Sequence, residues 1–208
     1  GNAAMGTQTD MQIRLADGGA GPRICCEGGG PHADGTYPDS FGFVPGYTGP
    51  QRVVASVYRK SGYAPVTAAH EMQLWCGATV FGNDNKRAIE ILLTLSGYMT
   101  IVWHDGPSNG YHVISSSELA AFAFDDGDTA TFELNRTAKT LKAWHNSTLC
   151  CSTQWATTHD EIDSTAQAIL NNLGSGGGLG GLRRSGDAVE GNWGFRNFRI
   201  SSVLQDAG

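Results

Sequence analysis

The sequence predicts an all-β protein, an antiparallel β-sandwich of two sheets with one short helix in a late connection. The first observation is the 131–149 segment, TFELNRTAKTLKAWHNSTL, in which apolar and polar residues alternate on both sides of a polar turn at 136–139. A period of two is typical of strands with one buried face. Secondly, short apolar runs recur between turn signals along the whole chain. Thirdly, 29 of the 208 residues are glycine, about twice the usual frequency, as expected for many tight turns.

A chain of this length and 40% hydrophobic content can build one sandwich around one core. We therefore expect a single domain over 1–208, with 1–10 loosely ordered. The net charge of −6 argues against a nucleic-acid binder, since the basic residues are scattered along the chain rather than clustered. No apolar run reaches the roughly 18 residues of a membrane-spanning helix.

The strands before the 131–149 hairpin are predicted from alternation and from flanking turn residues. In the clearest of them Val53, Ala55 and Val57 alternate with the residues between them. The 87–95 segment is apolar on both faces for most of its length, as expected for a central strand, with a buried helix as the alternative. In chain order the predicted strands are 11–15, 23–26, 41–44, 52–60, 71–80, 87–95, 98–104 and 111–114.

The later part of the chain combines a helix, a loop and a final strand. Asp163 or Ser164 can cap a helix over 163–173 whose apolar residues follow a helical period, and Gly174 can end it. A second helical segment, 117–124, is ambiguous. We expect a flexible loop at the glycine-rich stretch 174–181. The last strand is predicted at 192–203. Strict alternation would place Trp193, Phe195, Asn197 and Arg199 on one of its faces, and Arg196, Phe198 and Ile200 on the other.

Five cysteines occur as two adjacent pairs and one single residue. Adjacent strand residues point to opposite faces, so one bridge could join the Cys25/Cys26 pair to the Cys150/Cys151 pair; the alternative is buried thiols. Cys76 is expected in the core. Two glycosylation sequons begin at Asn135 and Asn146, and an extracellular or cell-surface location is our expectation.

Two motifs carry a resemblance to a known family. The hairpin matches the pattern T-L-x-x-[WY]-x-N-G-x-L at Thr140, Leu141, Trp144, Asn146 and Leu149, with Ser147 in place of Gly. The last strand matches F-R-N-[FI]-R-I over 195–200. The chain thus resembles the concanavalin A-like lectin/glucanase jelly rolls, which include laminin-G-like domains and the 3-keto-disaccharide hydrolase domain family. The resemblance implies a jelly roll, glycan binding on a sheet face and, in many members, a structural Ca²⁺.

Alternation also predicts where a sugar would bind. Met72, Leu74 and Cys76 are expected to face the core, which leaves Glu71, Gln73 and Trp75 on the opposite face. By the same reasoning Lys142 and Trp144 share the outer face of their strand. If these strands are neighbours, two indoles and several polar groups form one surface. Indole rings can cover a sugar ring and polar groups can bind its hydroxyls, so the predicted partner is a polysaccharide or oligosaccharide, bound by a module of a larger secreted or surface protein.

Two other functions stay open. In a glycoside hydrolase or polysaccharide lyase, Glu71 and Glu90 would be the acid/base pair, although the E-x-D-x-x-E motif of laminarinase-like glycosidases is absent. In a structural or adhesion domain there would be no pocket.

No cofactor is expected, and no metal site is assigned from the sequence. The candidates for a structural Ca²⁺ are three acidic residues of one loop, Asp125, Asp126 and Asp128. The particular glycan and the oligomeric state do not follow from the sequence.

Overall fold

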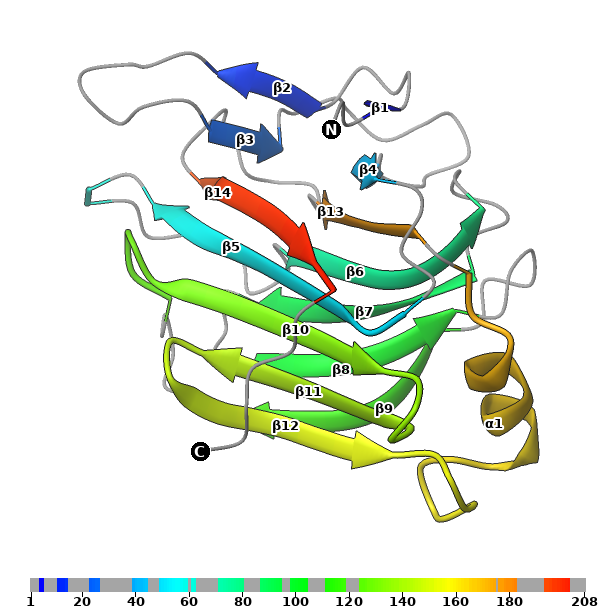
Figure 1. The fold of residues 1–208 in the computed structure, drawn as a ribbon. Helices are drawn as coiled ribbons and strands as arrows, with labels where there is room; N and C mark the ends of the chain where they lie inside the picture. Colours follow the sequence, from blue (N-terminus) through cyan, green and yellow to red (C-terminus); the bar gives the residue numbers. More distant parts are fainter. Residues whose placement is uncertain are drawn as a thin grey trace, which may run out of the picture.

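The computed structural model describes residues 4–5, 11–14, 23–26, 39–44, 49–59, 61–62, 71–80, 87–94, 98–104, 111–118, 124–174, 176–182 and 193–202, some of them by their backbone alone. These residues form two stacked antiparallel sheets of seven strands each (Figure 1). Sheet A has the order β1 (Ala4–Met5), β4 (Asp39–Val44), β13 (Gly176–Leu182), β6 (Glu71–Val80), β7 (Arg87–Thr94), β8 (Tyr98–His104) and β9 (Tyr111–Glu118). Sheet B has the order β12 (Thr148–Gln154), β11 (Thr140–His145), β10 (Thr129–Asn135), β5 (Gln51–Arg59), β14 (Trp193–Ser201), β3 (Arg23–Cys26) and β2 (Met11–Arg14). The predicted antiparallel two-sheet sandwich is confirmed.

The core lies between the two sheets. In β5 and β10 every second residue is fully buried, because these side chains meet those of sheet A while the residues between them face outward. Sheet A contributes Leu74, Cys76, Met99, Ile101 and Trp103; sheet B contributes Val53, Ala55, Val57, Phe132, Leu134, Leu141 and Phe195. The buried thiol of Cys76 fits the prediction made for it, and burial raises its pKa well above the ordinary range.

The predicted hairpin is formed by β10 and β11. Phe132 lies opposite Ala143 and Leu134 opposite Leu141, so that both strands turn the same face to the core. Lys139 closes the turn with a φ of 53°. The guanidinium of Arg136 donates a hydrogen bond to the carbonyl of Gly174 and thereby ties this turn to the segment after the helix.

The helix α1 (Ser164–Asn171) begins where the sequence predicts. The Asp163 carboxylate accepts a hydrogen bond from the Ala166 N–H at 2.7 Å and caps the helix. Ala166 and Leu170 are buried in the core. The helix packs beside one end of the sandwich (Figure 1), and among the described residues no helix is both long and apolar enough to cross a membrane.

The glycine-rich stretch is a strand, not the flexible loop that we predicted. β13 pairs with β4 on one side and with β6 on the other. Strand prediction rests on alternating side chains, and five of its seven residues have none. Backbone hydrogen bonds to both neighbours hold this strand in place, and only the tertiary structure supplies those neighbours.

Two further predictions need correction. The ambiguous helical segment 117–124 is wrong where the structure describes it: β9 continues to Glu118, and Phe124 is a buried residue outside any helix. In β14, a bulge between Arg196 and Arg199 adds one residue relative to β5, and Asn197 adopts a φ of 54°. The bulge shifts the alternation, so Phe195 and Ile200 both contact the core, against the prediction that they lie on opposite faces.

The proposed cysteine bridge is also wrong. Cys150/Cys151 belong to β12 and Cys25/Cys26 to β3, and five strand steps separate these strands in sheet B. At about 4.8 Å a step the separation is about 24 Å, whereas bridged cysteines have Cα atoms within roughly 7 Å. Cys76, Cys150 and Cys151 are free thiols.

Candidate binding faces of the sandwich

The five predicted sugar-binding residues do not form one surface. Glu71, Gln73 and Trp75 belong to β6 in sheet A, whereas Lys142 and Trp144 belong to β11 in sheet B. The inner faces of the two sheets pack against each other, so their outer faces look in opposite directions. The combined surface required β6 and β11 to be neighbouring strands, but they belong to different sheets.

The sheet A half of the prediction has a defined neighbourhood. Leu74 and Cys76 are fully buried, so alternation assigns positions 71, 73 and 75 to the outer face. The register places Trp75 between Gly178 of β13 and Glu90 of β7. Gln73 lies in the next row, between Gly180 and Leu92, and Glu71 in the row after that, between Leu182 and Thr94.

Sequence reasoning missed the glycines beside this row and the aromatic positions beyond them. In β4, Phe43 lies opposite Gly178 and Phe41 lies opposite Gly180. The Phe43 and Trp75 positions are thus two strand spacings apart, about 10 Å, with a position between them that has no side chain. A glycine run next to a predicted strand is the signal that could have revealed this arrangement. We call these positions the Trp75 row: Phe43, Gly178, Trp75 and Glu90.

The two candidate catalytic glutamates lie on the same outer face but in different rows. Glu71 is opposite Thr94, and Glu90 is opposite Trp75, four residues along the same strand. Four residues of extended chain and one strand spacing put their Cα atoms about 14 Å apart. A glutamate side chain extends several ångström from its Cα atom, so the two carboxyl groups reach the roughly 5–10 Å separation of a glycosidase pair only if both side chains lean toward each other along the strands.

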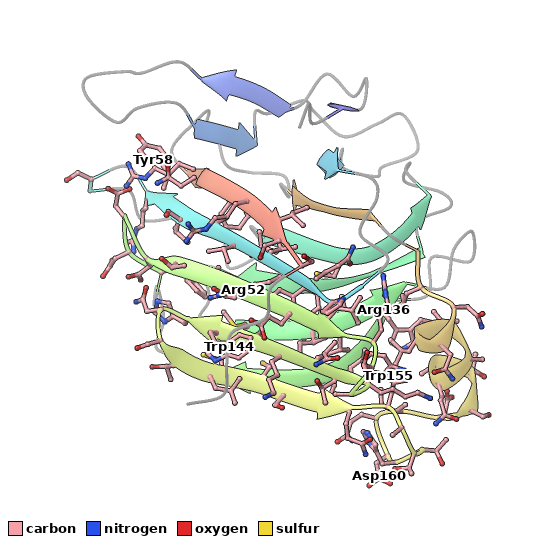
Figure 2. All side chains as sticks on the ribbon, in the orientation of Figure 1. Arg52, Tyr58, Arg136, Trp144, Trp155 and Asp160 are labelled. Carbon is pink, nitrogen blue, oxygen red and sulfur yellow. The ribbon has the colours of Figure 1, made fainter. Side chains whose placement is uncertain are left out.

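The sheet B half of the prediction lies in a charged row. Lys142 is opposite Glu133 on β10, which is in turn opposite Arg52 on β5. The Arg52 Nε lies 3.3 Å from the Glu133 carboxylate, which is almost fully buried. Trp144 is only 9% exposed and lies opposite the buried Thr131. Figure 2 shows Arg52 and Trp144 on the strands of sheet B, where the indole of Trp144 offers a ligand little ring surface.

The acidic loop 125–128 is held by cationic and amide side chains of the same chain. Arg59 donates hydrogen bonds from its backbone N–H to Asp126 (3.1 Å) and from its guanidinium to Asp125 (3.3 Å). Arg196 binds Asp126 at 2.7 Å and lies over the ring of Tyr58. Two arginines from β5 and β14 therefore fix the loop to the end of sheet B.

Asp128, the third calcium candidate, joins the loop to β11. Its carboxylate lies 2.7 Å from the His145 Nε2 and accepts hydrogen bonds from the Asn146 side chain (3.0 Å) and the Asp125 N–H (2.8 Å). The Asn146 side chain also accepts a hydrogen bond from the Thr129 N–H. Within the described residues no group of three or more His, Cys, Asp or Glu is arranged as a metal site. The contacts give the acidic loop a structural role in joining β5, β11 and β14.

We expect this carboxylate to make stability depend on acid pH. Burial alone would raise the pKa of Asp128, but the hydrogen bonds from Asn146, His145 and the Asp125 N–H lower it below its ordinary value. A lowered pKa in the folded state gives stability that is present above the unfolded-state value of about 3.9 and is lost as the pH falls through the folded-state value. The free energies of unfolding of the wild type and Asp128→Asn, measured in urea, should therefore differ above about pH 4 and converge below it. A difference that stays constant down to the lowest pH would contradict this role.

The fold and these faces define the class of protein: a jelly-roll β-sandwich with two differently composed outer faces. No protein-family model matches the chain, and no curated protein sequence matches it. Among solved structures, the chain is similar to the carbohydrate-binding module CBM66 from Bacillus subtilis, with a TM-score of 0.51, 12% identity and 92% of each chain covered.

Two other solved structures overlap less closely. Sheep galectin-11 in complex with glycerol has a TM-score of 0.49 and 10% identity over 77% of this chain and 96% of that one. A legume lectin-like domain from Entamoeba histolytica has a TM-score of 0.46 and 11% identity over 97% and 88%. At 12% identity the likeness to the CBM66 module establishes only the fold. The ligand is inferred from the chemistry of the two outer faces.

Proposed function

We propose that this protein is a carbohydrate-binding module that recognises a glycan on the outer face of sheet A. The observation that carries the proposal is the Trp75 row, in which an indole position lies between a glycine and a carboxylate position, with an amide, Gln73, in the next row. A flat ring covers the C–H face of a sugar, and neighbouring amide and carboxylate groups accept and donate hydrogen bonds to its hydroxyls. Backbone without side chains beside the ring gives the sugar room to approach.

A further finding supports a glycan-binding function. The sandwich overlaps over nearly its whole length with a solved carbohydrate-binding module. We expect the module to act outside the cell or on a surface, as part of a larger protein.

The test is a glycan array read with the wild type, Trp75→Ala and Trp144→Ala. If the Trp75 row binds the glycan, Trp75→Ala should weaken binding about tenfold, the equivalent of roughly 1.4 kcal/mol. Trp144→Ala is the matched control because it removes the same side chain from the opposite sheet. Thermal melts of all three proteins should show that the variants are folded at the assay temperature.

The proposal fails if the wild type binds no glycan or if Trp75→Ala binds as tightly as the wild type. Weaker binding by Trp144→Ala alone would place the ligand on sheet B instead. If the wild type releases reducing sugar from a bound glycan and Glu71→Gln does not, the protein is a hydrolase.

A further inference from the structure

The two sheets differ sharply in the charges that their strands carry. The seven strands of sheet A contain four acidic residues, Asp39, Glu71, Glu90 and Glu118, and one basic residue, Arg87. The seven strands of sheet B contain one acidic residue, Glu133, and seven basic ones, Arg14, Arg23, Arg52, Arg59, Lys142, Arg196 and Arg199. Residues that look scattered in an acidic sequence therefore gather in one sheet.

The register places nearly all of these basic residues on the outer face of sheet B. Phe195 is buried in the core, and Ile24 and Ile13 lie in register with it, so the adjacent positions Arg23 and Arg14, which oppose each other, belong to the outer face. Arg199 and Arg196 oppose Val54 and Ser56, which alternate with core residues. Arg52 and Lys142 flank Glu133. Six of the 14 Lys and Arg residues of the chain thus share this face, which we call the basic face: Arg14, Arg23, Arg52, Lys142, Arg196 and Arg199.

Four of the basic side chains on this face are at least partly exposed. Arg199 is exposed, and Lys142, Arg52 and Arg196 are partly exposed. Between them, Thr131, Val54 and the Glu133 carboxylate are almost completely buried. Two of the cations have carboxylate partners within the chain, since Arg52 lies beside Glu133 and Arg196 binds Asp126. The strands of this sheet contain no acidic residue besides Glu133.

We propose that the basic face is a second binding face and that its ligand is an anionic polysaccharide, one that carries sulfate or carboxylate groups. From β11 to β2 the face spans five strand steps, about 24 Å, so that a chain of several sugars can lie across it. Arginine and lysine bind sulfate and carboxylate oxygens through charge-assisted hydrogen bonds. This inference does not depend on the Trp75 row, because the two faces belong to different sheets.

The overall charge favours a polysaccharide over a nucleic acid. Duplex DNA carries one negative charge per about 1.7 Å of its axis, whereas the basic face offers six cations over about 24 Å. The chain as a whole has a net charge of −6, and the strands of sheet A are acidic, so a stiff duplex that extends past the basic face would be repelled by the rest of the molecule, whereas a flexible polysaccharide can stay within the face.

The test compares four polymers: neutral dextran, dextran sulfate, polygalacturonate and a single-stranded oligonucleotide. Binding of the wild type to dextran sulfate or polygalacturonate should exceed binding to dextran and should weaken as salt is added. Arg199→Gln and Lys142→Gln should each weaken it about three- to fivefold, as expected for loss of one exposed ion pair. Lys139→Gln is the matched control, because it removes the same charge at the β10–β11 turn, outside the basic face.

The variants distinguish binding at the basic face from binding at the Trp75 row on sheet A. Trp75→Ala should leave binding to dextran sulfate unchanged, and Arg199→Gln should leave binding to a neutral array glycan unchanged. Equal binding to dextran and dextran sulfate would overturn the proposal, as would an equal loss in Lys139→Gln and Arg199→Gln. Tighter binding to the oligonucleotide than to either anionic polysaccharide would assign the basic face to nucleic acid instead.

Discussion

Substituting Gly77 by alanine should destabilise the protein by about 3 kcal/mol. Gly77 has a φ of +68°, and a Cβ at this position would lie 3.0–3.2 Å from the Cβ and both methyl groups of Leu173. Its N–H donates to the Gln51 side chain (2.8 Å), and its carbonyl accepts from the Gly174 N–H (2.8 Å). The backbone is therefore held on both sides and cannot move away from Leu173. Urea unfolding of Gly77→Ala and the wild type measures the loss.

Gly62 provides the matched control for this prediction. It has a similar φ of +75°, but nothing lies within 4 Å of the position where its Cβ would be. Gly62→Ala should therefore show only the backbone cost, about 1 kcal/mol. If both substitutions destabilise the protein equally, the overlap with Leu173 contributes nothing and the explanation is wrong.

The second large effect is expected at Trp155. This indole is almost fully buried, and its Nε1 donates a hydrogen bond to the Asn171 side chain at the end of α1 (3.2 Å). Its backbone N–H donates to the Lys139 carbonyl, and its carbonyl accepts from the Gln167 side chain. Trp155 thus connects β12, the β10–β11 turn and α1. Trp155→Ala should cost about 3–5 kcal/mol through the cavity that it leaves, measured by chemical unfolding.

A double-mutant cycle separates the hydrogen bond from the packing. Trp155→Phe keeps a ring in the core and loses the N–H, and Asn171→Ala loses the acceptor. A coupling energy of about 0.5–1.5 kcal/mol is expected between them. Strictly additive effects would show that the bond contributes no stability.

Alternation in the sequence was enough to locate most of the strands. β3, β6 and β8 have the predicted bounds, and β10 and β11 form the predicted hairpin. The helix was predictable too, because Asp163 and the helical period of its apolar residues are both local signals. These predictions succeeded because burial of one face imposes its period on the nearby sequence.

The candidate site was less predictable. Alternation groups positions 71, 73 and 75 on the face opposite Leu74 and Cys76, which are buried, but it could not say which strands lie beside β6. The neighbours are β13, in which five of seven residues are glycine, and β7, the strand that follows β6 in sequence. The bulge at Asn197 likewise changed which residues of β14 face the core, since one inserted residue reverses the alternation that follows it.

By itself the sequence determined the fold class, most of the strands that carry side chains and the buried side of regular strands such as β5 and β10, because these follow from local periodicity. The tertiary structure alone decided sheet membership, because pairing depends on backbone hydrogen bonds between strands far apart in the chain. Those pairings placed Trp75 and Trp144 on different sheets. They also brought Arg14, Arg23 and Arg199 together with three other basic residues on one face, where like charges repel one another unless an anion lies between them.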